Sequence, residues 1–137
     1  METHGYSGRP LDKKLGIKEG YVIKVVNSPK KYIEFFFSFP KDVQIVHSEE
    51  KIPIDFAHIF CTTEKELETN FATAKKNLKK TGILWVSWPK KSSKIPTEID
   101  KFNVMDFGLR SGLVDTKVAA IDADWSGHKF VYRTKDR

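Results

Sequence analysis

The chain has 137 residues, of which 39% are hydrophobic and 12% aromatic, with a formal net charge of +6, and this length suits one domain with its own core. No apolar run reaches the roughly 18 residues of a membrane span, and the opening segment lacks the basic and apolar parts of a signal peptide, so no membrane partner is expected. The single cysteine, Cys61, excludes an intramolecular disulfide, argues against a zinc site and indicates a reducing, cytoplasmic setting.

The first half of the chain is predicted to hold one short helix, two strands and one ambiguous segment after a flexible arm. In chain order these are an arm at 1–10, a helix at 10–15, a strand at 21–26, a helix or strand at 32–37 and a short strand at 43–46. Gly16 suits the position just past the first helix, and the apolar run at 21–26 is typical of a strand buried on both faces. Ser28 and Pro29 favour a helix start.

The second half alternates strands and helices. In order, we predict a strand at 54–61, a helix at 64–80, a strand at 83–88, a helix at 98–109, and strands at 113–121 and 125–133. Capping-box spacings begin at Thr63 and at Thr97, and Gly82 suits a helix C-cap. The short turn at 122–124 predicts an antiparallel hairpin.

This order predicts a single three-layer, Rossmann-like α/β domain over residues 1–137, with a mostly parallel sheet that ends in an antiparallel edge hairpin. The strands at 21–26, 54–60 and 83–88 are expected to be parallel neighbours. The connection after the strand at 43–46 is too short for the usual parallel crossover. That strand is therefore either antiparallel or followed by bare chain across the sheet end.

The order of elements in residues 54–133 resembles the C-terminal half of the class I S-adenosylmethionine-dependent methyltransferase fold, in a reduced form. In that family the first strand leads into a glycine-rich loop whose backbone approaches the cofactor. Here residues 25–31 contain no glycine, Pro29 removes a backbone N–H, and the nearest acid for a ribose, Glu49, lies past its strand. No cofactor is predicted, and S-adenosylmethionine is expected not to bind.

Four segments of the sequence are distinctive: HGYSGRPL at 4–11, KLGI at 14–17, WVSWPKK at 85–91 and WSG at 125–127. Together they resemble a family of short bacterial proteins that is known as a domain of unknown function. The resemblance spans nearly the whole chain and implies that the chain is complete. It implies no activity.

The positive charge is concentrated in residues 75–94, which hold seven lysines and no acid. Such a concentration is typical of a surface for an anionic partner, although a solvated helix face gives the same pattern. Parallel-sheet geometry divides these lysines between the two edges of the sheet. The first lysine group, Lys75, Lys76, Lys79 and Lys80, is expected at the N-terminal edge, and the second lysine group, Lys90, Lys91 and Lys94, at the C-terminal edge.

Ligands bind beside the C-terminal edge of open α/β sheets, so the ligand-binding residues are predicted there. They follow three of the strands and comprise Ser28, Thr62, Trp88, Lys90, Lys91, Ser92, Ser93 and Lys94. Trp88 is the better candidate for stacking on a ring, because Trp85 lies in the middle of a strand and fits the core. A mobile basic loop at 90–94 is the alternative interpretation.

Other reactive side chains give no recognisable catalytic pattern, and the catalytic residues stay unassigned. His58 cannot share a strand face with Asp55 and Cys61, so it is expected in the core or at the edge of the sheet, and no metal site is predicted. Cys61 is expected to be a small buried residue, and Thr63 an N-cap. There is no Ser-His-Asp signature, P-loop or HExxH motif.

The sequence therefore predicts non-catalytic binding of an anionic small molecule or partner at the C-terminal edge. One alternative is an enzyme that acts on a nucleotide or phosphorylated substrate, with Lys90 or Lys91 as charge stabiliser. A further alternative is a nucleic-acid-associated protein that uses both lysine groups, because aromatic rings and lysines at one rim often hold single strands.

Overall fold

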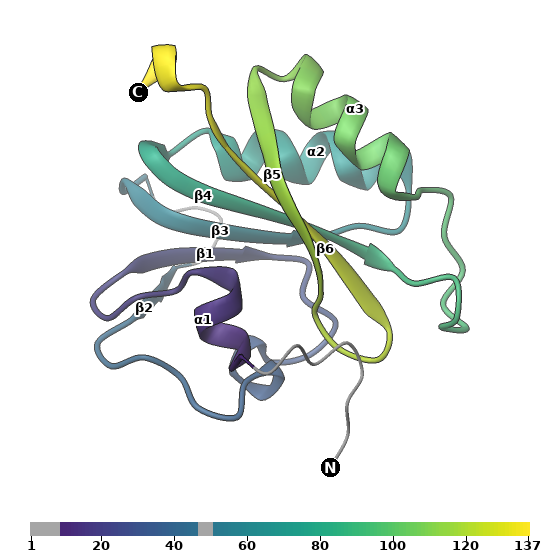
Figure 1. Ribbon diagram of the computed structural model, residues 1–137, viewed down its shortest axis with the longest axis horizontal. Coiled ribbons are helices and arrows are strands. Elements are labelled where there is room, and N and C mark those ends of the chain that lie inside the picture. The colour runs from purple at the N-terminus through teal and green to yellow at the C-terminus, as the bar shows by residue number, and fades with distance from the viewer. Residues whose placement is uncertain (1–8, 47–50) are drawn as a thin grey trace.

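A computed structural model describes residues 9–46 and 51–137, and its centre is a mixed six-stranded sheet in the order β2-β1-β3-β4-β6-β5 (Figure 1). The predicted arm at 1–10 lies almost entirely outside the described residues, as does Glu49. The strands are β1 (Val22–Val26), β2 (Gln44–Val46), β3 (Ile54–Phe60), β4 (Leu78–Pro89), β5 (Leu113–Ala120) and β6 (Trp125–Tyr132).

Strand directions agree with the predicted parallel core and edge hairpin. β1 pairs in parallel with β2 and β3, and β3 with β4, whereas β6 is antiparallel to both β4 and β5. The parallel neighbours at 21–26, 54–60 and 83–88 and the C-terminal hairpin are therefore confirmed. β2 is parallel to β1, so the antiparallel alternative for 43–46 is wrong; among the described residues, no helix stands between β2 and β3.

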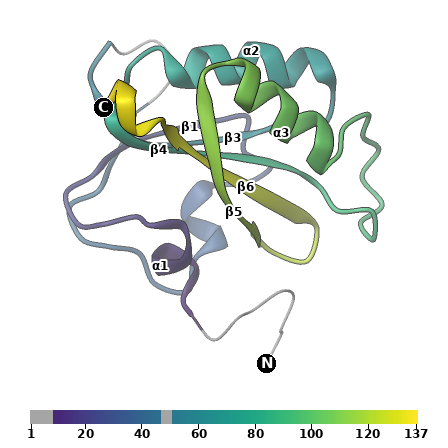
Figure 2. The ribbon, with the colours of Figure 1, turned by 45° about the horizontal axis from the view of Figure 1, so that its top comes forward.

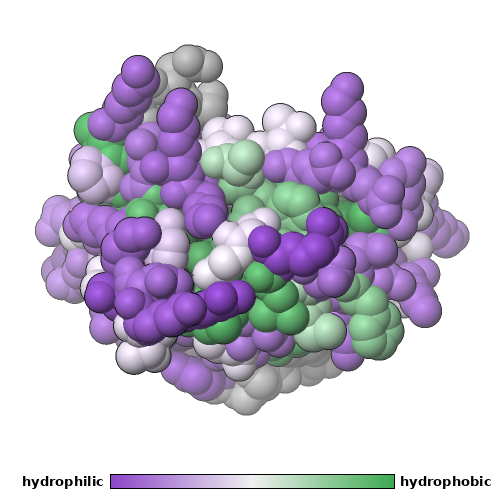
Figure 3. All heavy atoms as spheres, turned by 90° about the horizontal axis from the view of Figure 1, so that it is seen from above, coloured by the Kyte–Doolittle hydropathy of each residue, from purple (hydrophilic) through white to green (hydrophobic). Residues whose placement is uncertain are grey.

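Helices cover both faces of the sheet, which makes three layers (Figure 2). Helices α2 (Glu64–Lys75) and α3 (Lys101–Arg110) lie on one face, and α1 (Leu11–Leu15) and the 3-10 helix η1 (Tyr32–Phe35) on the other. A last 3-10 turn, η2, spans Thr134–Asp136. Seen from the side of α2 and α3, hydrophilic side chains cover most of the surface and hydrophobic ones show between them (Figure 3). No described helix is long and apolar enough to cross a membrane.

A buried tryptophan of the sheet forms a hydrogen bond with helix α1. We call the side of the sheet on which α1 lies the α1 face. Trp85 is fully buried, as expected, and its indole Nε1 donates a hydrogen bond to the carbonyl oxygen of Leu15 at 2.8 Å. Gly16 ends α1 with a positive φ of 89°, which a residue without a Cβ adopts readily. The predicted short helix and its glycine stop are therefore confirmed.

The helix predicted at 64–80 is shorter in the structure. α2 ends at Lys75, and Lys79 and Lys80 belong to β4, so Gly82 is a strand residue and not a helix C-cap. The cause is tertiary: Leu78 pairs with Ile54 and buries its side chain, which outweighs the helix propensity of the lysines.

Two predicted helix starts also need correction. The N-cap of α3 is Asp100 and not Thr97, and the Asp100 carboxylate accepts hydrogen bonds from the backbone N–H groups of residues 102 and 103. After β1 only the short helix η1 forms, without an α-helix, because the Ser28 hydroxyl donates to the carbonyl of Lys30 at 2.6 Å instead of capping one. The segment of three phenylalanines is neither a long helix nor a strand.

Candidate functional site

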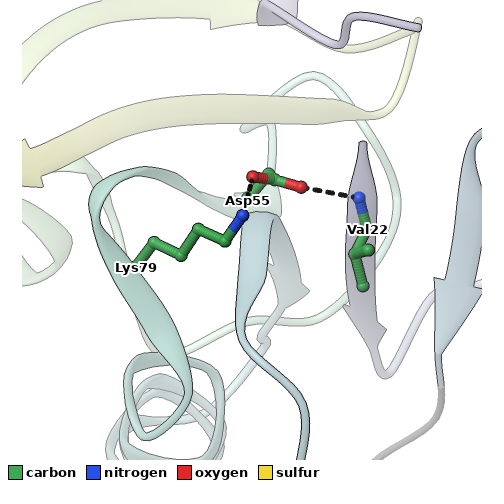
Figure 4. A network of polar contacts seen from close by, with 3 residues as sticks. All are labelled: Val22, Asp55 and Lys79. Atoms are coloured by element: carbon green, nitrogen blue, oxygen red, sulfur yellow. Dashed lines mark hydrogen bonds and ion pairs between the residues drawn. The ribbon is translucent and has the colours of Figure 1, made fainter. Parts of the chain in front are cut away.

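Three of the four lysines of the first group, Lys75, Lys79 and Lys80, have structural partners. Lys79 forms an ion pair with Asp55 at 2.8 Å, and the second oxygen of Asp55 accepts the backbone N–H of Val22, also at 2.8 Å (Figure 4). Lys75 donates to the carbonyl of Ser111 at 2.7 Å, and the ammonium of Lys80 lies 4.3 Å from the ring centroid of Tyr132. These lysines therefore stabilise the fold at the N-terminal edge.

The second lysine group lies on a loop closed by its own atoms. The backbone N–H and the hydroxyl of Ser93 both donate to the carbonyl of Lys90, at 3.0 and 2.8 Å. The backbone N–H of Lys90 donates to the carbonyl of Asp124 at 2.8 Å, which ties the loop to the β5–β6 turn. The side chains of Lys91, Ser92 and Lys94 are exposed and have no polar partner in the described part of the chain.

A hollow of about 530 Å³ opens beside this loop, where β4 ends and β6 begins. We call it the β4 hollow; it is lined by residues 88–91, 97–102 and 126. Trp88 forms part of its wall but is only 6% exposed, whereas the ring of Phe102 is 65% exposed. Phe102, and not the predicted Trp88, is therefore the ring available for stacking.

In the β4 hollow the carboxylates accept hydrogen bonds from the backbone, whereas the lysines form no ion pair with a described carboxylate. Its two carboxylates are bound to helix N-termini: Glu98 accepts the backbone N–H of Glu64 at 3.1 Å, and Asp100 caps α3. Lys90, Lys91 and Lys101 line the same hollow, and no described carboxylate forms an ion pair with them. The hollow therefore offers positive charge to a ligand, while its negative charge is used by the backbone.

Thr62 lies at the same edge, but its polar groups are used within the protein. Its backbone N–H and hydroxyl donate to one oxygen of Glu66, at 2.8 and 3.0 Å, and its carbonyl accepts from Thr97 and Glu98. These bonds, above all that of the Thr62 N–H, lower the pKa of Glu66 below its ordinary value. Thr63 caps α2 by accepting the N–H of Glu66, as predicted.

Ser28 lies in a different hollow. This second hollow, of about 490 Å³, is mostly apolar and sits beside β1 and β2, with Lys30, Lys31 and Ile33 in its wall. The structure therefore brings Trp88, Lys90 and Lys91 together in the β4 hollow and keeps Ser28 apart from them. Asn27 takes a positive φ of 61°, and its side-chain amide donates to the carbonyl of Phe60 at 3.0 Å.

Lys101, Phe102 and Ser126 are residues of the β4 hollow that the sequence analysis missed. Ser126 is the cross-strand partner of Trp88 in the β4–β6 pair. Aligning the predicted hairpin against β4 would have found it. Lys101 and Phe102 were not predicted to belong to the site, because the helix was expected to begin at residue 98. α3 begins at Lys101 instead, so these two residues form its first turn, which lines the hollow.

The buried reactive side chains are held in their neutral forms. His58 is fully buried between the Tyr32 hydroxyl and the Ser87 hydroxyl, each at 2.7 Å, and burial lowers its pKa to about 3. Burial, followed by the charge of Glu66, raises the pKa of Cys61 to about 12. The buried position expected for Cys61 is confirmed, and of the two positions expected for His58, core or edge, the structure shows the core.

The fold is that of the S-adenosylmethionine-dependent methyltransferases. A methyltransferase from Aquifex aeolicus is similar with a TM-score of 0.59 at 17% identity, over 86% of this chain and 85% of that one. A TehB-like methyltransferase from Corynebacterium glutamicum gives 0.52 at 9%, over 84% and 82%. Fibrillarin from Aeropyrum pernix, with natively bound S-adenosyl-L-methionine, gives 0.55 at 13%, over 93% and 71%. At such identities the similarity concerns the fold.

The sequence places the chain in a family, which is a more specific assignment than the fold. Residues 42–134 match the family described as "Protein of unknown function (DUF3052)", so the chain belongs to that family. This confirms the resemblance to a domain of unknown function. Comparison with curated proteins gave no significant sequence match.

Proposed function

We propose that the protein binds an anionic small molecule in the β4 hollow and does so without catalysis. The observation that carries this proposal is that the carboxylates of the hollow are bound to the backbone while its lysines are not paired with them. Lys90, Lys91 and Lys101 line it, whereas the carboxylates of Glu98 and Asp100 are bound to helix N-termini. An anion in the hollow therefore meets ammonium groups without displacing an internal ion pair.

The apolar wall narrows the class of ligand. Phe102 exposes most of its ring, and Trp88 and Pro89 lie beside it with the hydroxyl-bearing Ser126. A molecule with a flat ring and a phosphate or carboxylate group matches both parts of the wall. A nucleoside monophosphate is one such molecule.

Binding without catalysis is supported by the state of the reactive groups. The pKa of Cys61, about 12, keeps its thiol protonated near neutral pH, and a thiol is a poor nucleophile. His58 is enclosed between Tyr32 and Ser87, away from solvent. The free buried thiol also accords with a reducing, cytoplasmic setting, which stays part of the proposal.

S-adenosylmethionine is expected not to bind, although the fold is shared with methyltransferases. The turn after β1 holds Asn27 with its amide bonded to Phe60, then Pro29, and η1 is a single 3-10 turn. Few backbone N–H groups are thus directed at a ligand. Calorimetry with S-adenosylmethionine should give no heat of binding; a micromolar dissociation constant would refute this expectation.

The proposal is tested by thermal shift with nucleoside monophosphates, aromatic carboxylates and a short oligonucleotide. A ligand at 100 times its dissociation constant stabilises by about 2.7 kcal/mol. The variant Lys90→Gln/Lys91→Gln should bind a small-molecule hit about tenfold more weakly. The control, Lys65→Gln/Lys76→Gln, removes equal charge from exposed positions and should change affinity less than about twofold.

Other outcomes would contradict the proposal. Equal losses in the two variants would indicate a diffuse basic surface. Preference for the oligonucleotide, with affinity that falls steeply with salt, would favour nucleic-acid binding instead. Turnover of a bound nucleotide would favour the enzyme alternative.

A further inference from the structure

A third group of lysines gathers on the opposite face of the C-terminal hairpin. Lys117 of β5 and Lys129 of β6 are cross-strand partners, and Lys129 is also opposite Trp85 of β4. Directly opposed residues project from the same face of a sheet. Because Trp85 contacts α1, the two lysines lie on the α1 face, whereas the β4 hollow lies on the face of α2 and α3.

Lys14 reaches this place from α1. Its ammonium donates to the carbonyl oxygen of Ala120 at 3.2 Å, three positions along β5 from Lys117. Lys90 stands at the margin, because its backbone is bonded to the carbonyl of Asp124 in the hairpin turn. Helix α1, strands β5 and β6, and the segment after β4 therefore each bring a lysine to the hairpin.

The charges of these lysines disfavour one another. Burial first, and then the charges of Lys117 and Lys90, lower the pKa of Lys14. Burial and then Lys117 lower the pKa of Lys129. Within the described residues no carboxylate forms an ion pair with Lys90, Lys117 or Lys129, and all four lysines are half-buried. Like charges directly opposite in a strand pair reduce stability, and such conflicts concentrate at functional sites.

We propose that Lys14, Lys117 and Lys129, with Lys90 at the margin, form a second anion site, here called the hairpin site, for a compact polyvalent anion such as a diphosphate group. The three lysines come from α1, β5 and β6 and lie on the same side of the sheet as α1. One group that carries several negative charges neutralises all of them, whereas a long polyanion follows a row of charges along a surface.

The hairpin site is independent of the β4 hollow. The two lie on opposite faces of the sheet, and the residues that line the hollow do not include Lys14, Lys117 or Lys129. Lys90 is near both, so it is left unchanged in the test. Failure of one proposal therefore leaves the other standing.

Calorimetry with inorganic pyrophosphate, and with orthophosphate for comparison, tests the hairpin site. Pyrophosphate should bind more tightly than orthophosphate, and Lys117→Gln/Lys129→Gln should weaken pyrophosphate binding at least about tenfold. The matched control, Lys65→Gln/Lys76→Gln, removes the same charge from exposed positions outside both sites and should leave pyrophosphate binding within about twofold. Unchanged binding by the first variant, or equal losses in both, would overturn the proposal.

Two further measurements do not depend on that comparison. Lys117→Gln removes a repulsion, so its Tm should rise by about 1–4 °C, which also verifies that the variant is folded. Pyrophosphate should raise the lowered pKa of Lys14 and Lys129, so the wild-type protein takes up protons on binding near pH 10.5, where pyrophosphate is already fully ionised and releases none. Calorimetry in two buffers of different ionisation enthalpy measures this uptake, and binding without uptake would contradict the assigned contacts.

Discussion

The lysines at the two edges of the sheet carry the same charge but stand in different surroundings. At the N-terminal edge, Lys75, Lys79 and Lys80 each contact a carbonyl, a carboxylate or a ring of the same molecule. At the C-terminal edge, Lys91 and Lys94 have no polar partner among the described residues, and within the hairpin Lys117 faces Lys129. This difference shows that a concentration of lysines in the sequence does not by itself locate a ligand site. A lysine is available to a ligand only where the fold has not already given its ammonium group a partner.

The largest expected effect concerns the partnered edge. Asp55→Ala should lower the free energy of unfolding by about 1–3 kcal/mol, because it leaves the N–H of Val22 without its acceptor as well as Lys79 without its ion pair. Lys79→Ala should cost less than about 1 kcal/mol, since the Lys79 side chain is 46% exposed and that of Asp55 only 20%. Urea denaturation of both variants measures this. Equal costs would mean that the ion pair, and not the Val22 bond, stabilises this edge.

A smaller effect is expected for Lys75. Lys75→Met keeps the apolar stem but removes the donor to the carbonyl of Ser111, so it should cost about 1 kcal/mol. Lys76 is exposed next to it, and Lys76→Met should stay within about 0.5 kcal/mol of wild type. If the two variants had the same midpoint in urea, the first lysine group would be no more engaged than the second.

The smallest effect is a pH dependence of stability that arises from the lysines of the hairpin site. A lysine whose pKa is lower in the folded state binds fewer protons there than in the unfolded state, so stability rises as pH rises toward the ordinary value of 10.5. Lys117→Gln relieves part of this repulsion on Lys14 and Lys129. Its gain in stability over wild type should therefore be largest at neutral pH and shrink as pH approaches 10.

Denaturation of both proteins at pH 7.5, 8.5 and 9.5 measures that difference. Comparing the two proteins is necessary because Cys61, with a pKa of about 12, destabilises the folded state at alkaline pH. This contribution cancels between wild type and variant. A gain independent of pH would show that repulsion among these lysines is negligible.

Much of the fold was predictable because it follows local patterns. The apolar runs at 21–26, 54–60 and 83–88 contain neighbouring parallel strands, and the short turn at 122–124 joins an antiparallel hairpin. Element ends were harder. α2 stops at Lys75 because Leu78 pairs with Ile54, a contact between distant residues that no local pattern records.

The candidate site was predictable only in part, for the same reason. Trp88, Lys90 and Lys91 follow one strand and so stay together in the β4 hollow. Thr62 was a plausible hydroxyl by position, but the Glu66 side chain at the start of α2, part of the capping-box spacing, already accepts its hydrogen bond. The hairpin site joins Lys14 to Lys117, and a spacing of that length carries no signal in a single sequence.

The bond between Trp85 and Leu15 has a consequence for how the chain folds during synthesis. Seventy residues separate the two, which corresponds to roughly 4–14 s of translation at about 5–20 residues per second. Over that interval the apolar side of α1 has emerged, but the strand that will bury it has not. The helix made first is thus among the last to reach its place, and a chain halted before β4 presents Leu11 and Leu15 to chaperones and proteases.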